Sequence, residues 1–222
     1  EFQKHWDRID IICPYLETFK VQKVFDNVYF YPSPVKFKIL HPFFVYLQGK
    51  KLIRQREYML FTSHDYGLQL NGIGSWFLHK ATGLGYVSEI LHVEGYPIAV
   101  SLKERLLRNI AKWYISFVKN DVLAFRVINK NSSYSFIKNL TVDSDKILVL
   151  YAIYIDFNVF YPANLTKDYD LIFCGRLALN KGLLTLLRAT ILLINEFPNI
   201  KLLIVGRGPL KQKLDQFIID NK

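Results

Sequence analysis

Cysteine is scarce in this chain, whose 222 residues include only Cys13 and Cys174. No metal-binding or redox spacing links the two, and each lies in an apolar run, which predicts buried free thiols in a reducing compartment. No apolar run approaches the roughly 18 residues that cross a bilayer. The first residues also lack the pattern of a signal peptide. These absences argue against a disulfide-stabilised or membrane-spanning protein and favour a cytoplasmic one.

Arginine-rich tracts and nucleic-acid-binding motifs are absent as well, so no nucleic acid is expected among the partners. What the chain does contain is typical of a globular protein with a substantial core, since 51% of its residues are hydrophobic and 22% are charged. Basic residues outnumber acidic ones and give a net charge of +10. This charge favours an anionic partner such as a nucleotide diphosphate or an anionic lipid headgroup, although a merely soluble basic surface explains it equally well.

Short apolar runs alternate with amphipathic stretches along the first two thirds of the chain. The strands expected from this pattern span 8–14, 27–31, 58–62, 86–92, 122–128 and 146–150, and the expected helices span 39–55, 67–79, 102–119 and 132–138. The alternation predicts a parallel sheet covered by helices on both faces. Right-handed crossovers then place the carboxyl ends of the strands along one edge, where the ligands of such sheets bind.

Four polar residues that fall at these strand ends are candidates for a site: His64, Asp65, His92 and Glu94. Each also has a structural interpretation. Asp65 could cap the helix expected at 67–79, and a histidine at a strand end is more often structural than functional. The pattern alone leaves both interpretations open.

A second series of strands and helices begins at Tyr169. A buried strand is expected at 170–174 and breaks at Gly175, and helix-compatible residues resume at Asn180, which fits a helix N-cap. Arg176 and Lys181 remain on the loop and the first helical turn. Two cations beside a helix N-terminus form a site for a phosphate or diphosphate, whereas most arginines and lysines are ordinary surface cations.

The chain continues with a strand expected at 201–205, the loop Gly206-Arg207-Gly208-Pro209 and a helix from Leu210 toward Lys222. The glycine pair also fits a plain strand-to-helix turn, because the third glycine and the acidic residue of a dinucleotide fingerprint are missing. We therefore divide the chain into a first domain at 1–155, a connection at 156–168 and a second domain at 169–222. The second, with about 54 residues, is near the lower limit for an independent core and is expected to be incomplete or to lean on the first.

Taken in order, these motifs resemble glycosyltransferase family 4, the glycosyl transferases of group 1. Gly175-Arg176-x-x-x-x-Lys181-Gly182 matches the family's Gly-Arg-Leu…Lys-Gly motif, and Gly206-x-Gly208-Pro209 matches the end of the block that follows. Asp156-x-x-x-Phe160-x-Pro162 matches the segment before the C-terminal domain. The segments 64–67 and 89–97 look like the acceptor-side loops. The resemblance covers most of the chain and is tightest from Asp156 onward.

The resemblance implies a GT-B fold: an α/β protein of two Rossmann-like domains with parallel sheets, the first without its first strand and the second incomplete. It also implies a retaining hexosyltransferase of polysaccharide or glycoconjugate biosynthesis. The donor would be a UDP- or GDP-sugar, and the acceptor a saccharide, a glycan or a lipid-linked sugar. No metal or other cofactor is expected, because fixed cations would stabilise the negative charge of the leaving diphosphate.

Residue by residue, the resemblance implies two catalytic cations, Arg176 and Lys181, and a catalytic histidine, His92. The donor diphosphate would be bound by Arg176 and Lys181 together with the loop glycines Gly175, Gly206 and Gly208. On the acceptor side, the resemblance points to His64, Asp65 and Glu94.

The family's glycine-rich loop would lie before Glu1 and its pair of glutamates beyond Lys222, so the chain is expected to be a fragment that is inactive alone. The alternative is a truncated sugar-nucleotide-binding module, or one that docks on a membrane or a partner. The expected helix at 102–119 either packs on the core with a solvated basic rim or touches an anionic membrane at its inner face. A nucleic-acid-binding α/β protein is a third, weaker alternative.

Overall fold

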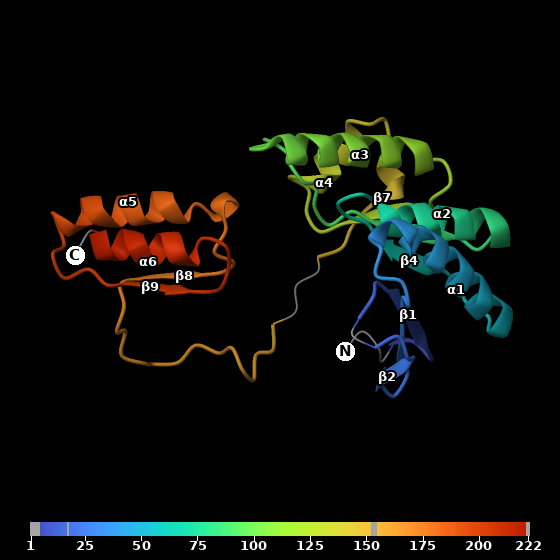
Figure 1. Ribbon diagram of the computed structural model, residues 1–222, viewed down its shortest axis with the longest axis horizontal. Coiled ribbons are helices and arrows are strands. Elements are labelled where there is room, and N and C mark those ends of the chain that lie inside the picture. Colours follow the sequence, from blue (N-terminus) through green and yellow to red (C-terminus); the bar gives the residue numbers. More distant parts are fainter. Residues whose placement is uncertain (1–4, 17, 152–154, 221–222) are drawn as a thin grey trace. The chain divides into compact units, whose positions relative to one another are not determined.

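The structure is a computed structural model that describes residues 5–16, 18–151 and 155–220. The chain divides into two compact units, Glu1–Tyr154 and Ile155–Lys222. Between 156 and 168 the chain forms turns and extended backbone with no helix or strand (Figure 1).

A four-stranded parallel sheet forms the centre of the first unit, as the alternating pattern predicts. Its strand order is β4-β5-β6-β7. The strands are β4 (Phe61–His64), β5 (Tyr86–Glu89), β6 (Ala124–Val127) and β7 (Ile147–Val149). All neighbouring pairs are parallel, so the four carboxyl ends meet along one edge of the sheet. The α/β class and the Rossmann-like parallel arrangement are therefore present.

The first two expected strands do not join this sheet. β1 (Ile9–Cys13) and β3 (Val28–Pro32) pair in parallel within a separate sheet of order β1-β3-β2. Its third strand, β2 (Gln22–Phe25), pairs antiparallel to β3 through a tight turn. Sequence reasoning missed β2 because the strand is short and mostly exposed, so no apolar alternation marks it.

The helices of the first unit lie close to their expected positions. They are α1 (His41–Gln55), α2 (Leu70–Thr82), α3 (Leu102–Val118) and α4 (Ser133–Lys138), with short 3-10 turns at Lys38–Leu40 and Ser144–Lys146. α3 begins at a true N-cap, where the Ser101 hydroxyl accepts from the Glu104 backbone N–H. α2 begins three residues later than expected, because Gly67 and Gln69 adopt left-handed backbone before it.

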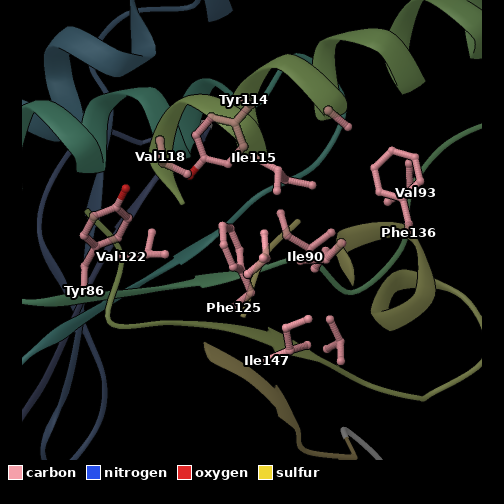
Figure 2. Packing of buried hydrophobic residues seen from close by; sticks show 14 residues of the cluster. Tyr86, Ile90, Val93, Tyr114, Ile115, Val118, Val122, Phe125, Phe136 and Ile147 are labelled. Atoms are coloured by element: carbon pink, nitrogen blue, oxygen red, sulfur yellow. The ribbon is translucent and has the colours of Figure 1, made fainter. Parts of the chain in front are cut away.

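The core of the first unit lies between α3 and the parallel sheet. Figure 2 shows Tyr114, Ile115 and Val118 of α3 facing Phe125 of β6 and Ile147 of β7. These side chains are at most 6% exposed. Removing this much apolar surface from water is the main stabilising contribution in a domain of this size, and it holds the carboxyl edge of the sheet in place.

The second unit contains the parallel strands β8 (Leu171–Cys174) and β9 (Leu202–Val205) and the helices α5 (Leu183–Ile194) and α6 (Lys211–Asp220). In Figure 1 both helices lie on the same face of this two-stranded sheet. Leu177, Leu183, Leu187, Leu210 and Leu214 form the buried core. The last helix was expected to continue toward Lys222, and residues 221–222 lie outside the described part of the chain.

Two expectations about burial are wrong, one for β8 and one for the two cysteines. The strand was expected to be buried, but only one face is covered, and Ile172 on the other is 69% exposed. Cys174 is exposed and Cys13 half-buried, so neither free thiol is fully buried. A short apolar run in the sequence does not distinguish a strand that is buried on both faces from one that is covered on a single face.

Among the described residues, no helix is both long enough and apolar enough to cross a membrane.

Candidate functional site

Three ionisable side chains line up across the carboxyl ends of β4, β5 and β6. The strand register places His64 opposite Glu89 and Glu89 opposite Arg126. The His64 Nδ1 lies 3.7 Å from one carboxylate oxygen of Glu89, and the Arg126 Nη1 donates to the other at 2.7 Å. His64 is half exposed, whereas Glu89 retains 15% exposure, so the carboxylate is largely covered and lies between the His64 ring and the Arg126 guanidinium.

These contacts shift the pKa values of Glu89 and His64. Burial alone would raise the pKa of Glu89, but the His64 ring and the Arg126 guanidinium beside it outweigh this effect and lower that pKa below its usual value. The Glu89 carboxylate in turn raises the pKa of His64. The row therefore presents a histidine with enhanced proton affinity to solvent, which suits a hydrogen-bond donor to an oxygen-rich ligand.

Replacing Glu89 by Gln is expected to lower the pKa of His64, because the imidazolium loses its carboxylate partner. An NMR titration of the His64 ring protons measures this directly. Glu57→Gln, which removes an exposed carboxylate outside the row, serves as the control and leaves the midpoint in place. An unchanged His64 midpoint in Glu89→Gln would show that the pair does not interact in solution.

His92 and Glu94 lie on a loop that follows β5. The strand was expected to reach His92 but ends at Glu89, so His92 lies on the loop and is 65% exposed. The Glu94 Oε1 accepts from the Gly67 backbone N–H at 3.1 Å and lies 3.9 Å from the His92 Nε2. The other oxygen, Oε2, is shielded from solvent and has no hydrogen-bond partner among the described residues. This loop therefore presents an exposed imidazole beside a carboxylate with unused acceptor capacity.

The same loop is fixed to the helices behind it. The Arg108 Nη1 of α3 donates to the Gly95 carbonyl at 3.0 Å, and the Tyr96 ring packs edge-on against Phe136 of α4. Gly95 has φ +71°, and a Cβ there would lie 2.8 Å from the Glu104 carbonyl oxygen. Any larger residue at Gly95 would push the loop away from α3, so the glycine is needed to hold His92 at the edge of the sheet.

The position of Asp65 fits neither of its two expected roles, as a cap of α2 or as an acceptor-side residue. It does not cap α2, which has no side-chain cap, and it is only 1% exposed. Its carboxylate accepts from the hydroxyls of Ser63 at 2.5 Å, Ser88 at 2.5 Å and Tyr114 at 2.9 Å. A Cβ at Gly72 would overlap the Tyr114 hydroxyl, so this glycine makes room for the network. A side chain this buried cannot contact an acceptor directly, so its position supports a structural role beneath the site.

In the second unit, Arg176 and Lys181 lie on the loop that follows β8. Both are exposed, and neither has an ion-pair partner among the described residues. The helix was expected to begin at Asn180 with that residue as its cap, which is wrong. Residues Leu179–Lys181 form a 3-10 turn, and α5 begins after Gly182, whose φ of +69° redirects the backbone. Lys181 therefore lies next to Gly182, the N-cap of α5, and the N–H groups in the first turn of α5 add to the positive potential there.

Gly206 and Gly208 allow close packing between two loops of the second unit. A Cβ at Gly206 would overlap the Gly175 carbonyl oxygen, and one at Gly208 would overlap the Leu177 backbone. The Leu177 N–H donates to the Arg207 carbonyl, and the Leu210 N–H donates to the Leu177 carbonyl. The glycines thus allow two loops at the carboxyl end of the sheet to pack backbone against backbone, which fixes the loop that carries Arg176.

Of the predicted residues, His64, His92 and Glu94 lie at the carboxyl edge of the first unit's sheet. The second unit's loops carry Gly175, Arg176, Lys181, Gly206 and Gly208. Sequence reasoning did not select Glu89 or Arg126. Their signal was available in principle, because both are charged residues within apolar strands and share one register position. Within the described residues, no group of three or more His, Cys, Asp or Glu side chains is arranged to hold a metal ion.

No protein-family model matches the chain, and no curated protein matches it at a significant level.

Proposed function

We propose that this protein is a retaining glycosyltransferase of the GT-B type that moves a hexose from a nucleotide diphosphate sugar to a saccharide or lipid-linked acceptor. The observation that carries the proposal is the loop after β8. It presents two exposed cations without ion-pair partners among the described residues, Arg176 and Lys181, beside the N-terminus of α5. A guanidinium, an ammonium and free backbone N–H groups are the donors that a diphosphate requires.

The proposed chemistry concerns the bond between the sugar and the diphosphate. As that bond breaks, negative charge grows on the leaving diphosphate, and fixed cations stabilise this charge more in the transition state than in the ground state. Arg176 can donate to two phosphate oxygens at once because its guanidinium is planar and carries several N–H groups. Lys181 supplies a compact positive charge. These two side chains would do what a metal ion does in other transferases, so the proposal requires no metal.

The first unit is proposed to handle the sugar and the acceptor. His92 is exposed, and the neighbouring Glu94 leaves one carboxylate oxygen without a donor among the described residues. His64, with its raised pKa, is suited to donating a hydrogen bond to a sugar oxygen. Side chains of this kind bind hydroxyl groups, and they fit a saccharide better than an apolar ligand.

The test is a thermal-shift and calorimetry screen of the chain with UDP and GDP, with uridine and guanosine as controls that lack phosphates. One of the diphosphates is expected to raise the melting temperature, because a ligand that binds only the folded state stabilises it. The matching nucleoside should have little effect, since the proposed contacts are to the phosphates. Failure of every nucleotide diphosphate to bind would contradict the proposal, and tight, salt-sensitive binding to RNA or DNA would favour a nucleic-acid-binding protein instead.

A further inference from the structure

Aromatic side chains form a contiguous row from α3 to α2, in which Trp113, Phe117 and Phe77 are exposed and Trp76 is half-buried. Trp113 stacks on Phe117 with ring centroids 5.3 Å apart, Phe117 lies 4.7 Å from Trp76, and Trp76 lies 5.0 Å from Phe77. Trp113 is 56% exposed, Phe77 50% and Phe117 43%. Large rings are normally covered, so a row of them in contact with water marks a surface that binds something apolar.

The row continues onto α1. Figure 1 shows α2 between α1 and α3, and an open groove of about 490 Å³ separates Phe43 and Tyr46 of α1 from Phe77 of α2. Phe43 is 67% exposed. The outer surfaces of three successive helices therefore share one aromatic band.

α3 also exposes aliphatic side chains in line with Trp113. Leu102 and Leu106 on its first two turns are 81% and 59% exposed, while Tyr114 and Ile115 are buried against the core. The helix is thus apolar toward the protein and also carries an apolar stripe toward solvent. Only the side chains on the inward face pack in the core. The outer stripe therefore has no role in core packing in the described part of the chain.

The charge of the three helices is strongly one-sided. Together α1, α2 and α3 contain eight Lys and Arg residues and a single acidic residue, Glu104. Lys80 is paired with Asp121, which lies outside these helices, but Arg105 and Lys112 are exposed without ion-pair partners among the described residues. A protein surface that bound another apolar protein face would not need this excess of positive charge, whereas an anionic bilayer complements it.

We propose that this surface docks on the anionic face of a lipid bilayer. The aromatic-basic face is defined here by Phe43, Phe77, Leu106, Lys112, Trp113 and Phe117. Its rings and aliphatic side chains would insert at the level of the headgroups, where tryptophan and phenylalanine are favoured, and its cations would neutralise lipid phosphates. Long lysine and arginine side chains can extend to the phosphates while their methylenes stay against the apolar band. None of these residues is assigned to glycosyl transfer, so membrane docking at this face is independent of that function.

The test uses sedimentation of the chain with phosphatidylcholine vesicles that contain either no anionic lipid or about 30% phosphatidylglycerol. Binding to the anionic vesicles is expected to exceed binding to the neutral ones by about tenfold or more, and to weaken at high salt. The double variant Phe77→Ser/Trp113→Ser should lose about tenfold or more in partitioning. The matched control is Phe25→Ser/Val24→Ser, which removes exposed apolar groups from β2, outside this face, and should bind as the unmodified chain does.

Tryptophan fluorescence supplies a second measurement, because the chain contains only three tryptophans, Trp6, Trp76 and Trp113. Adding anionic vesicles should shift the emission to shorter wavelength, and brominated lipids should quench it. Trp6→Phe should retain both effects, whereas Trp113→Phe should lose most of them. Absence of binding to anionic vesicles, or equal losses in the Phe77/Trp113 variant and the β2 control, would overturn the proposal, with circular dichroism confirming that each variant is folded.

Discussion

Replacing both Arg176 and Lys181 by alanine is expected to weaken binding of the nucleotide diphosphate by about 3–6 kcal/mol, which amounts to between two and four orders of magnitude. Each substitution removes one charge-assisted contact worth about 1.5–3 kcal/mol. Calorimetric titration with whichever of UDP and GDP binds the unmodified chain measures the loss. If the proposed glycosyl transfer is assayed, kcat/KM for the donor should fall by a similar factor, since the same contacts would stabilise the leaving group.

The control for this double variant is Arg188→Ala/Lys213→Ala. It removes the same charge from exposed positions on α5 and α6 of the same unit, so any effect of net charge alone would appear in both variants. Donor affinity should stay near that of the unmodified chain in the control. Equal affinity in all three proteins, or equal losses in the two variants, would remove the loop after β8 from the proposed function.

The largest expected effect on stability concerns Asp65. Burial raises the pKa of this carboxyl to about 7, against the opposing effect of three hydroxyl donors. Because the folded protein holds the proton more tightly than the unfolded chain, the associated stability is fully present below pH 4 and is lost as the pH rises through 7. The difference between the two pKa values corresponds to about 4 kcal/mol of unfolding free energy.

Asp65→Asn keeps the shape of the side chain but cannot ionise, so it should remove this pH dependence. Denaturant unfolding of the unmodified chain and of the variant between pH 4 and pH 8 measures the difference. The unfolding free energy of the variant should gain on that of the unmodified chain as the pH rises. Asp143→Asn, at an exposed position, should track the unmodified chain at every pH. Parallel curves for Asp65→Asn would show that the buried carboxyl keeps an ordinary pKa.

The sequence pattern predicts helices and strands well where they depend on residues that are close together in the chain. The boundaries of α3 follow from its period and from Ser101 and Glu104 at its start, which form a cap within four residues of each other. The parallel strands β4 to β7 followed from alternation with helices. The start of α2 was missed, because Gln69 is a non-glycine residue in left-handed backbone and no local signal announces that conformation.

The candidate site was predictable in part for the same reason. His64, His92 and Glu94 were located because strand ends of a parallel sheet meet at one edge. Glu89 and Arg126 were not selected because their contact depends on the register between β5 and β6, which joins residues 37 positions apart. Periodicity indicates which residues are strand residues but not which residues of two strands lie opposite each other.

The sequence by itself determined the α/β class, the positions of most helices and strands, and the loop with Arg176 and Lys181, because these follow from spacing and residue type over short distances. Only the tertiary structure decided that Asp65 lies in the core and that His64 pairs with Glu89. It also decided which side of α3 faces water. The physical reason is that burial and ionisation depend on what packs against a side chain. For Asp65 these groups include Ser88 and Tyr114, which lie 23 and 49 residues away along the chain.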